Sequence, residues 1–303
     1  MRLQHLSIVQ NESIAGYVKA IRRSVLYAIV WLWTIVMGFP IFWMVSTALK
    51  TERQANAYPP QWLPDPVQWQ NFYDSMAVAN FGRYFFNTAV VSLTTVVFAL
   101  FFSSLAGYTF ARLRFPGRNL LFFIILSTMM VPGQVTMIPI FVMMSRFPLL
   151  GGNNLMGQGG AGLLNTYPAL IIPHVAGAFY IFMMRQFMST LPSELSDAAR
   201  IDGASEFGIF WRIMLPLSGP ALTTMGLFAF ANSWNSFLWP LVVTNTESMR
   251  TVQLGLAVFR GIYFTQTTLF MAGTTITTLP VLILFLFGQR YFVRGIALSG
   301  IKG

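Results

Sequence analysis

The sequence predicts an all-α integral membrane protein with six transmembrane helices. Hydrophobic residues make up 55% of the 303 residues and charged residues only 9%. An ordinary soluble domain is about a quarter charged, so this composition is too apolar for a water-exposed surface. The apolar residues also gather in runs of about 20, the length that crosses the hydrocarbon core of a bilayer. The solvent for most of this chain is therefore expected to be lipid.

Six such runs follow one another along the chain. They are predicted at about residues 24–47, 85–111, 120–142, 167–188, 213–243 and 269–287. The first run begins too late and extends too far for a cleaved signal peptide, so it is expected to remain in the protein. An even number of spans places both termini on the same side of the membrane.

The spans divide the chain into regions. A tail at residues 1–23 precedes the first transmembrane helix at 24–47, and an extracytoplasmic loop follows at 48–83. A core at 84–288 contains the other five helices and a charged loop at 190–216, and a second tail occupies 289–303.

Basic residues orient this arrangement, because positive charges near the ends of spans are retained in the cytoplasm. Thirteen of the 19 basic residues fall on one predicted face, so both termini and the 190–216 loop are expected to be cytoplasmic. The thirteen are Arg2, Lys19, Arg22, Arg23, Arg112, Arg114, Arg118, Arg185, Arg200, Arg212, Arg290, Arg294 and Lys302. The net charge is +10, but these residues form no continuous basic face, so nucleic acid is not an expected partner.

Prolines occur in most of the predicted spans. Among them are Pro40, Pro132, Pro139, Pro173, Pro216, Pro220, Pro240 and Pro280. Proline removes a helix hydrogen bond, which the membrane tolerates only where neighbours or water satisfy the freed carbonyl. Two interpretations are open: the prolines serve helix packing, or they bend helices around a pathway.

The spans lack the chemistry of proton-driven carriers and intramembrane enzymes. Their middle portions contain no Asp, Glu or Lys, and the chain has two histidines and no cysteine. No catalytic residue and no metal site are predicted. His174, beside Pro173, is either a packing residue or a relay. A driving force is therefore expected from a partner protein.

The loop at 190–216 has the pattern of a docking element. Its acidic residues Glu194 and Asp197 suit the start of a helix, and Gly203 suits a left-handed residue after it. Ser205 and Glu206 can then start a second helix. One face of the first helix is predicted to carry Leu195, Ala198, Ala199 and Asp202. This predicts a short helix-turn-helix whose narrow face of small residues fits the groove of a partner.

The same residues resemble a known motif. The spacing of Asp197-Ala198-Ala199, Gly203 and Ile213-x-Leu215-Pro216 is similar to the EAA loop of permease subunits of bacterial ATP-binding-cassette (ABC) importers, with Asp replacing the usual Glu. The string "LPSELSDAARIDGAS" resembles the carbohydrate branch, of the maltose (MalG-like) type. Further matches are "LAGYTFARLRFPGRN", "MMVPGQVTMIPIF", "RQFMSTLPSEL", "WNSFLWPL" and "QRYFVRGIALSGIKG".

The resemblance implies a type I ABC importer permease fold with a cytoplasmic coupling helix, in a bacterial inner membrane. It implies four protein partners: a second permease of the MalF-like type, two cytoplasmic ATPases and an extracytoplasmic solute-binding protein. ATP and Mg would bind the ATPases, so this chain is expected to need no cofactor and to be no enzyme. The coupling residues implied are Glu194, Leu195, Asp197, Ala198, Ala199, Asp202, Gly203, Ile213, Leu215 and Pro216. The alternatives are a six-span secondary carrier or channel without ATPases, and a membrane enzyme.

The implied cargo is a sugar, oligosaccharide or related polyol, which is recognised by amides and aromatic faces. Candidates for the substrate pathway are Gln134, Asn232, Trp234, Asn235 and Trp239. Hydrogen bonding between helices accounts equally well for any one of them. A glycine-rich outer loop at 151–162 lengthens the chain relative to many relatives. It is either a tolerated insertion or a contact for the binding protein.

Overall fold

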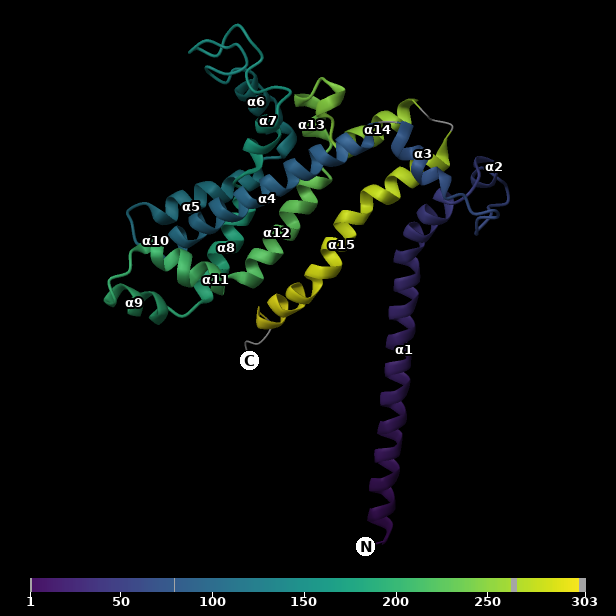
Figure 1. Cartoon of the computed structure of the whole chain (residues 1–303). Helices are drawn as coiled ribbons and strands as arrows, with labels where there is room; N and C mark the ends of the chain where they lie inside the picture. The colour runs from purple at the N-terminus through teal and green to yellow at the C-terminus, as the bar shows by residue number, and fades with distance from the viewer. Residues whose placement is uncertain (1, 79, 263–265, 300–303) are drawn as a thin grey trace. The chain divides into compact units, whose positions relative to one another are not determined.

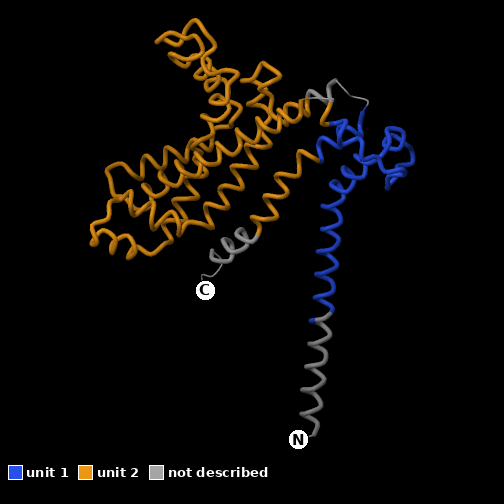
Figure 2. The backbone as a smooth tube through the Cα atoms, viewed as in Figure 1, with its two compact units in different colours: residues 1–75, 265–275 blue, residues 76–264, 276–303 orange. Residues whose placement is uncertain are grey.

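The structure is a computed structural model that describes residues 2–78, 80–262 and 266–299. Of the basic residues named above, Lys302 lies outside the described residues. Every regular element in the described ranges is a helix. The chain forms two compact units (Figure 2), one of residues 1–75 with 265–275 and one of residues 76–264 with 276–303.

The first unit is built on α1 (Arg2–Ala48), whose stretch Ile21–Ala48 is long and apolar enough to cross a membrane. The loop after α1 folds back on the end of that helix. Lys50 is fully buried there: its Nζ donates to the Gln61 carbonyl at 2.5 Å and lies 4.2 Å from the centroid of the Trp43 ring. The short helix α2 (Glu52–Ala55) follows, and α3 (Gln70–Val78) begins in this unit.

The second unit is organised around α4 (Phe81–Arg112), which packs against α8 (Ala178–Thr190) and α12 (Gly219–Trp234) (Figure 1). Gly107 allows the contact with α8, because a Cβ at this position would lie 2.6 Å from the Cβ of Met184. A core of buried Met, Tyr and Phe side chains forms where α4 and α8 meet the 206–225 region.

The remaining elements connect these helices. They are α5 (Arg118–Ser127), η1 (Thr128–Met130), α6 (Gly133–Ser145), α7 (Tyr167–Ile171), η2 (Ile172–His174), α9 (Glu194–Ile201), α10 (Glu206–Ile209), the π-helical η3 (Phe210–Met214), α11 (Leu215–Leu217), α13 (Leu238–Val243), η4 (Glu247–Met249), α14 (Val252–Ile262) and α15 (Thr267–Ser299).

The six predicted spans are present, but only three of them are continuous helices. Ile21–Ala48, Phe81–Arg112 and Thr267–Gln289 are each long and apolar enough to cross a membrane, and counting three bent helix pairs as one span each gives six. The bends measure 105° between Arg118–Met130 and Gly133–Ser145, 44° between Tyr167–His174 and Ala178–Thr190, and 80° between Glu206–Leu217 and Gly219–Trp234. The fifth predicted span also ends early, because α13 is a separate helix.

Proline accounts for where the spans break. Pro132 directly precedes α6, Pro216 and Pro220 lie in the first turns of α11 and α12, and Pro173 lies in η2. Proline fixes φ and lacks an N–H, so it suits the start of a helix and opposes its continuation. Pro40, Pro139 and Pro280 instead lie inside continuous helices.

Candidate functional site

The segment 190–216 folds as the predicted helix-turn-helix. After α9, Gly203 adopts the left-handed conformation with φ +80°, which a residue without Cβ adopts at little cost. Ser205 then caps α10, because its Oγ accepts a hydrogen bond from the Gly208 N–H at 3.2 Å. Local sequence signals therefore determined this element.

A hydrogen-bonded ion network fixes the two short helices to α4. Arg200 on α9 lies 2.8 Å from the Asp197 carboxylate and 2.7 Å from the Glu206 carboxylate. Glu206 also accepts a hydrogen bond of 2.6 Å from the Tyr108 hydroxyl on α4. The hydrogen bond to Glu206 raises the pKa of the Arg200 guanidinium above its usual value.

The predicted small-residue face of α9 is partly buried and partly exposed. Ala199 is only 9% exposed and belongs to the core formed with Met184 and Ile209, so it faces its own chain. Leu195 and Ala198 are exposed, and Ile201 is 86% exposed. The surface of α9 that is open to a partner is thus centred on Leu195, Ala198 and Ile201. Of the other predicted coupling residues, Ile213 and Leu215 are half-buried, and Glu194, Asp197, Asp202, Gly203 and Pro216 are exposed.

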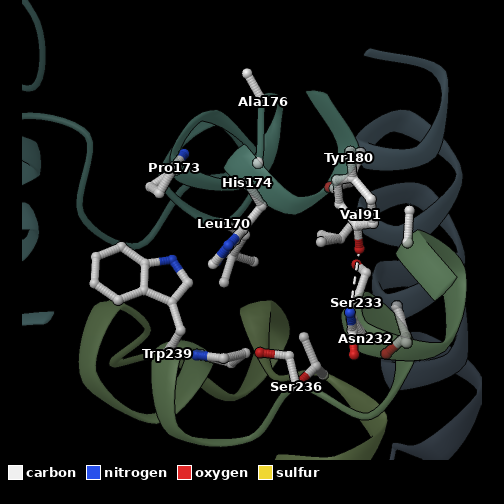
Figure 3. A pocket seen from close by; sticks show the side chains of 16 residues that line it. Val91, Leu170, Pro173, His174, Ala176, Tyr180, Asn232, Ser233, Ser236 and Trp239 are labelled. Atoms are coloured by element: carbon white, nitrogen blue, oxygen red, sulfur yellow. Dashed lines mark hydrogen bonds between the residues drawn. The ribbon is translucent and has the colours of Figure 1, made fainter. Parts of the chain in front are cut away.

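A cavity of about 250 Å³ lies elsewhere in the second unit (Figure 3). Asn232 and Trp239, two of the predicted pathway residues, line it together with His174 and Tyr180. The Asn232 amide donates to the Tyr180 hydroxyl at 3.1 Å. The rings of His174 and Trp239 meet edge to face, with centroids 6.2 Å apart. Pro173 and Pro240 also line this space, so two of the spans' prolines border a cavity.

Gln134 and Asn235 line a neighbouring pocket of about 680 Å³, which shares His174 and Trp239 with the cavity. Asn235 is held on both sides. Its Nδ2 donates to the Ala231 carbonyl at 2.9 Å, and its Oδ1 accepts from Gln253 Nε2 at 3.2 Å. Four of the five predicted pathway residues therefore lie at two adjoining pockets.

Trp234, the fifth predicted pathway residue, lies in the core and not at the pockets. Its indole is buried, donates to the Thr277 carbonyl at 3.0 Å and stacks on Phe230. It lines neither of the two pockets and joins α12 to α15.

Several lining residues were not predicted from the sequence. They are Tyr180 and the hydroxyl residues Thr88, Thr95, Ser233, Ser236 and Thr251. The signal that could have indicated two of them is the polar string Asn232-Ser233 followed by Ser236, inside an otherwise apolar run. Within the described ranges, no group of three or more His, Cys, Asp or Glu side chains could hold a metal ion.

The glycine-rich loop between α6 and α7 is ordered around one asparagine. Buried Asn153 donates to the Ser145 and Phe147 carbonyls at 2.9 and 3.0 Å and accepts from the Gly160 N–H at 2.8 Å. This frame leaves the apolar side chains of Leu155 and Met156 exposed. In Figure 1 the loop and α9 lie at widely separated places on the second unit.

Comparisons with known proteins agree with this architecture. The family described as "Binding-protein-dependent transport system inner membrane component" matches residues 99–298. The arabinooligosaccharides transport system permease protein AraQ of Halalkalibacterium halodurans is 37% identical over 283 residues, which cover 90% of this chain and 96% of that protein. The sn-glycerol-3-phosphate transport system permease protein UgpE of Yersinia enterocolitica is 33% identical over 266 residues, covering 85% and 90%.

A solved structure shows the same fold. One chain of a bacterial ABC transporter involved in the import of the acidic polysaccharide alginate superposes with a TM-score of 0.76 at 24% identity, covering 90% of this chain and 96% of that one. The all-α membrane architecture and the ABC importer permease fold are thus confirmed. The chain is a multi-pass membrane protein and belongs to the inner-membrane components of binding-protein-dependent transport systems.

Proposed function

We propose that this chain is the non-catalytic permease subunit of an ATP-driven importer for a sugar or oligosaccharide. Two cytoplasmic ATPases would bind ATP with Mg and supply the energy. A second, MalF-like permease would complete the pathway, and an extracytoplasmic binding protein would deliver cargo. AraQ, the more similar of the two relatives described above, bears the name of an oligosaccharide transport system, which supports this class of cargo.

The observation that carries the proposal is the arrangement of α9. One side of this helix is fixed to α4 through Arg200, Glu206 and Tyr108. The other side presents Leu195, Ala198 and Ile201 to a partner. A helix that is attached to a spanning helix yet carries an unpartnered apolar surface can transmit the movement of a docked protein. A secondary carrier has no use for such a surface.

The proposed orientation places both termini and the coupling segment, residues 190–216, in the cytoplasm. The asymmetry of the basic residues supports this orientation. The glycine-rich loop would then lie outside, where exposed Leu155 and Met156 could contact the binding protein.

The test is reconstitution of the complete complex in proteoliposomes with its binding protein. We expect uptake of a radiolabelled neutral oligosaccharide, such as arabinotriose or lactose, that requires both ATP and the binding protein. Uptake that persists without ATPase subunits would indicate the secondary carrier instead.

A further inference from the structure

The cavity in Figure 3 carries an inference about cargo that rests on the proposed function. We infer that it is a subsite for one neutral sugar ring, which it binds through hydroxyl groups and an aromatic surface. Sugars with a carboxylate or phosphate on that ring are excluded. Every described residue that lines it comes from the second unit.

The size of the cavity sets the first limit. Its volume of about 250 Å³ is below the range of roughly 300–1,000 Å³ that is typical of ligand pockets. The cavity is therefore assigned to one ring, and the rest of an oligosaccharide would extend into the adjoining pocket of about 680 Å³, which shares His174 and Trp239.

The polar groups match sugar hydroxyls, which both donate and accept hydrogen bonds. The Tyr180 oxygen accepts from Asn232, so its own hydrogen is directed elsewhere and is available to a ligand. Asn232 keeps its carbonyl oxygen as an acceptor. The hydroxyls of Ser233 and Ser236 line the same space and can act in either role.

Two further hydroxyl residues line the cavity, but their oxygens are buried. Thr95 and Thr251 both line the cavity, and neither side-chain oxygen has a hydrogen-bond partner among the described residues. A buried hydroxyl without a partner is destabilising, and native proteins contain few of them. Both oxygens are covered by the surrounding protein, so the hydrogen-bonding groups offered to a ligand are those of Tyr180, Asn232, Ser233 and Ser236.

Trp239 supplies an apolar surface. Its only donor, Nε1–H, is used by the Ala169 carbonyl at 2.9 Å, so the ring offers the cavity carbon surface rather than a hydrogen bond. The edge-to-face contact with His174 holds the indole in place. Aromatic carbon surface complements the apolar C–H face of a sugar ring.

The absence of charge in the lining decides the chemical class. No Asp, Glu, Lys or Arg is among the described residues that line the cavity. A carboxylate or phosphate placed there would lose its hydration without gaining a counter-charge, which is far more costly than transferring a hydroxyl that finds partners. The relatives' names include both neutral arabinooligosaccharides and anionic sn-glycerol-3-phosphate, and this cavity favours the neutral class.

The test uses the complete transporter with its binding protein in proteoliposomes. Radiolabelled arabinotriose and lactose serve as neutral probes, and sn-glycerol 3-phosphate and an alginate trisaccharide serve as anionic probes. Tyr180→Phe, Asn232→Ala and Ser233→Ala each remove one hydrogen-bonding group from the cavity. Tyr27→Phe is the control. It removes the same phenolic hydroxyl from an exposed residue of α1 that does not line the cavity.

We expect uptake of a neutral probe and no uptake of either anionic probe. Loss of one hydrogen bond should lower the import rate of the neutral sugar at subsaturating concentration by about tenfold in at least Tyr180→Phe and Asn232→Ala. ATP hydrolysis stimulated by the loaded binding protein should persist, and Tyr27→Phe should import normally.

Three outcomes would overturn the inference. If the wild-type transporter imports a sugar and all three cavity variants import it equally well, the cavity is no subsite and the proposed function survives. If an anionic probe is imported as fast as a neutral one, the neutral class is wrong. If the complete wild-type complex imports none of the probes, the proposed carbohydrate function fails and the subsite fails with it.

Discussion

The Tyr108 hydroxyl on α4 donates a hydrogen bond of 2.6 Å to Glu206 at the start of α10, 98 residues further along the chain. Tyr108 is 1% exposed and the Glu206 side chain 42%, so this bond is partly buried. The same carboxylate accepts a hydrogen bond from Arg200 on α9. One carboxylate therefore joins a spanning helix to both short helices of the coupling segment.

Tyr108→Phe should weaken this junction without creating a cavity, because only the hydroxyl is removed. A hydrogen bond to a charged group contributes about 1.5–3 kcal/mol, so we expect a measurable fall in the unfolding temperature of the purified complex. Import per ATP hydrolysed should fall as well, since α9 would no longer move together with α4. Import and ATP hydrolysis can be measured on one proteoliposome preparation.

Tyr84→Phe is the matched control, because Tyr84 lies on the same helix and donates to Glu247 at 3.1 Å. It should lower stability similarly but leave the import-to-hydrolysis ratio unchanged. An equal loss of coupling in both variants would contradict a specific role for the Tyr108–Glu206 bond.

Neighbouring alanines on α9 should respond differently to the same substitution. Ala198→Asp places a charge on the exposed surface, so the two permeases should assemble while the ATPases dissociate or hydrolyse ATP without import. Ala199→Asp buries a charge in the chain's own core, which costs several kcal/mol, so the subunit itself should be lost. Quantifying permease and ATPase subunits after co-purification separates the two phenotypes. Wild-type retention and transport in Ala198→Asp would refute the docking surface.

The different environments of Ala198 and Ala199 show the limit of local sequence patterns. Gly203 and Ser205 were predicted correctly, because a left-handed turn and a helix cap are decided within a few residues. The burial of Ala199 depends on α8 and α10, and nothing in the helix period identifies which side meets them.

Bends in the spans and contacts between distant residues at the cavity were also not predicted from the sequence. Hydropathy identified the apolar runs but not the 105° bend at Val131 and Pro132, since a proline in an apolar run is compatible both with a continuous helix, as at Pro139, and with a break. The contact between Tyr180 and Asn232 joins residues 52 apart, and a tyrosine in an apolar run carries no mark of such a partner.

The glycine-rich loop should lose its shape in Asn153→Ala, which removes three hydrogen bonds from a buried side chain. Leaving the Gly160 N–H and two carbonyls without these partners should destabilise the loop by about 1–3 kcal/mol. If the loop receives the binding protein, stimulation of ATP hydrolysis by that protein should weaken, while basal hydrolysis and complex assembly persist.

Met156→Ser provides a second variant that leaves the loop frame intact and changes only an exposed apolar side chain. Unchanged import at limiting binding-protein concentration in both variants would favour a tolerated insertion over a contact.

Asn235→Ala should alter the apparent affinity for cargo or the preference between sugars, because Asn235 lines the pocket next to the cavity. The substitution also releases Gln253, which now donates to Asn235 Oδ1. Asn235→Asp keeps that acceptor, although it loses the bond to the Ala231 carbonyl and adds a negative charge, so it serves as the comparison for the Gln253 contact. Basal ATP hydrolysis should persist in both. Failure of Asn235→Ala to accumulate in the membrane would instead indicate packing, and normal import across a sugar panel would remove Asn235 from the pathway.

The orientation of the chain can be tested with single cysteines, since the sequence contains none. Met156 in the glycine-rich loop is 81% exposed and Ile201 on α9 is 86% exposed, so a cysteine at either position should react freely with a maleimide that reaches it. Because thirteen of the 19 basic residues lie on the face predicted to be cytoplasmic, we expect Met156→Cys to react with a membrane-impermeant maleimide in intact cells. Ile201→Cys should react only after the membrane is permeabilised. Labelling of Ile201→Cys but not Met156→Cys in intact cells would reverse the orientation, and an ATPase could then not dock on α9 from the cytoplasm.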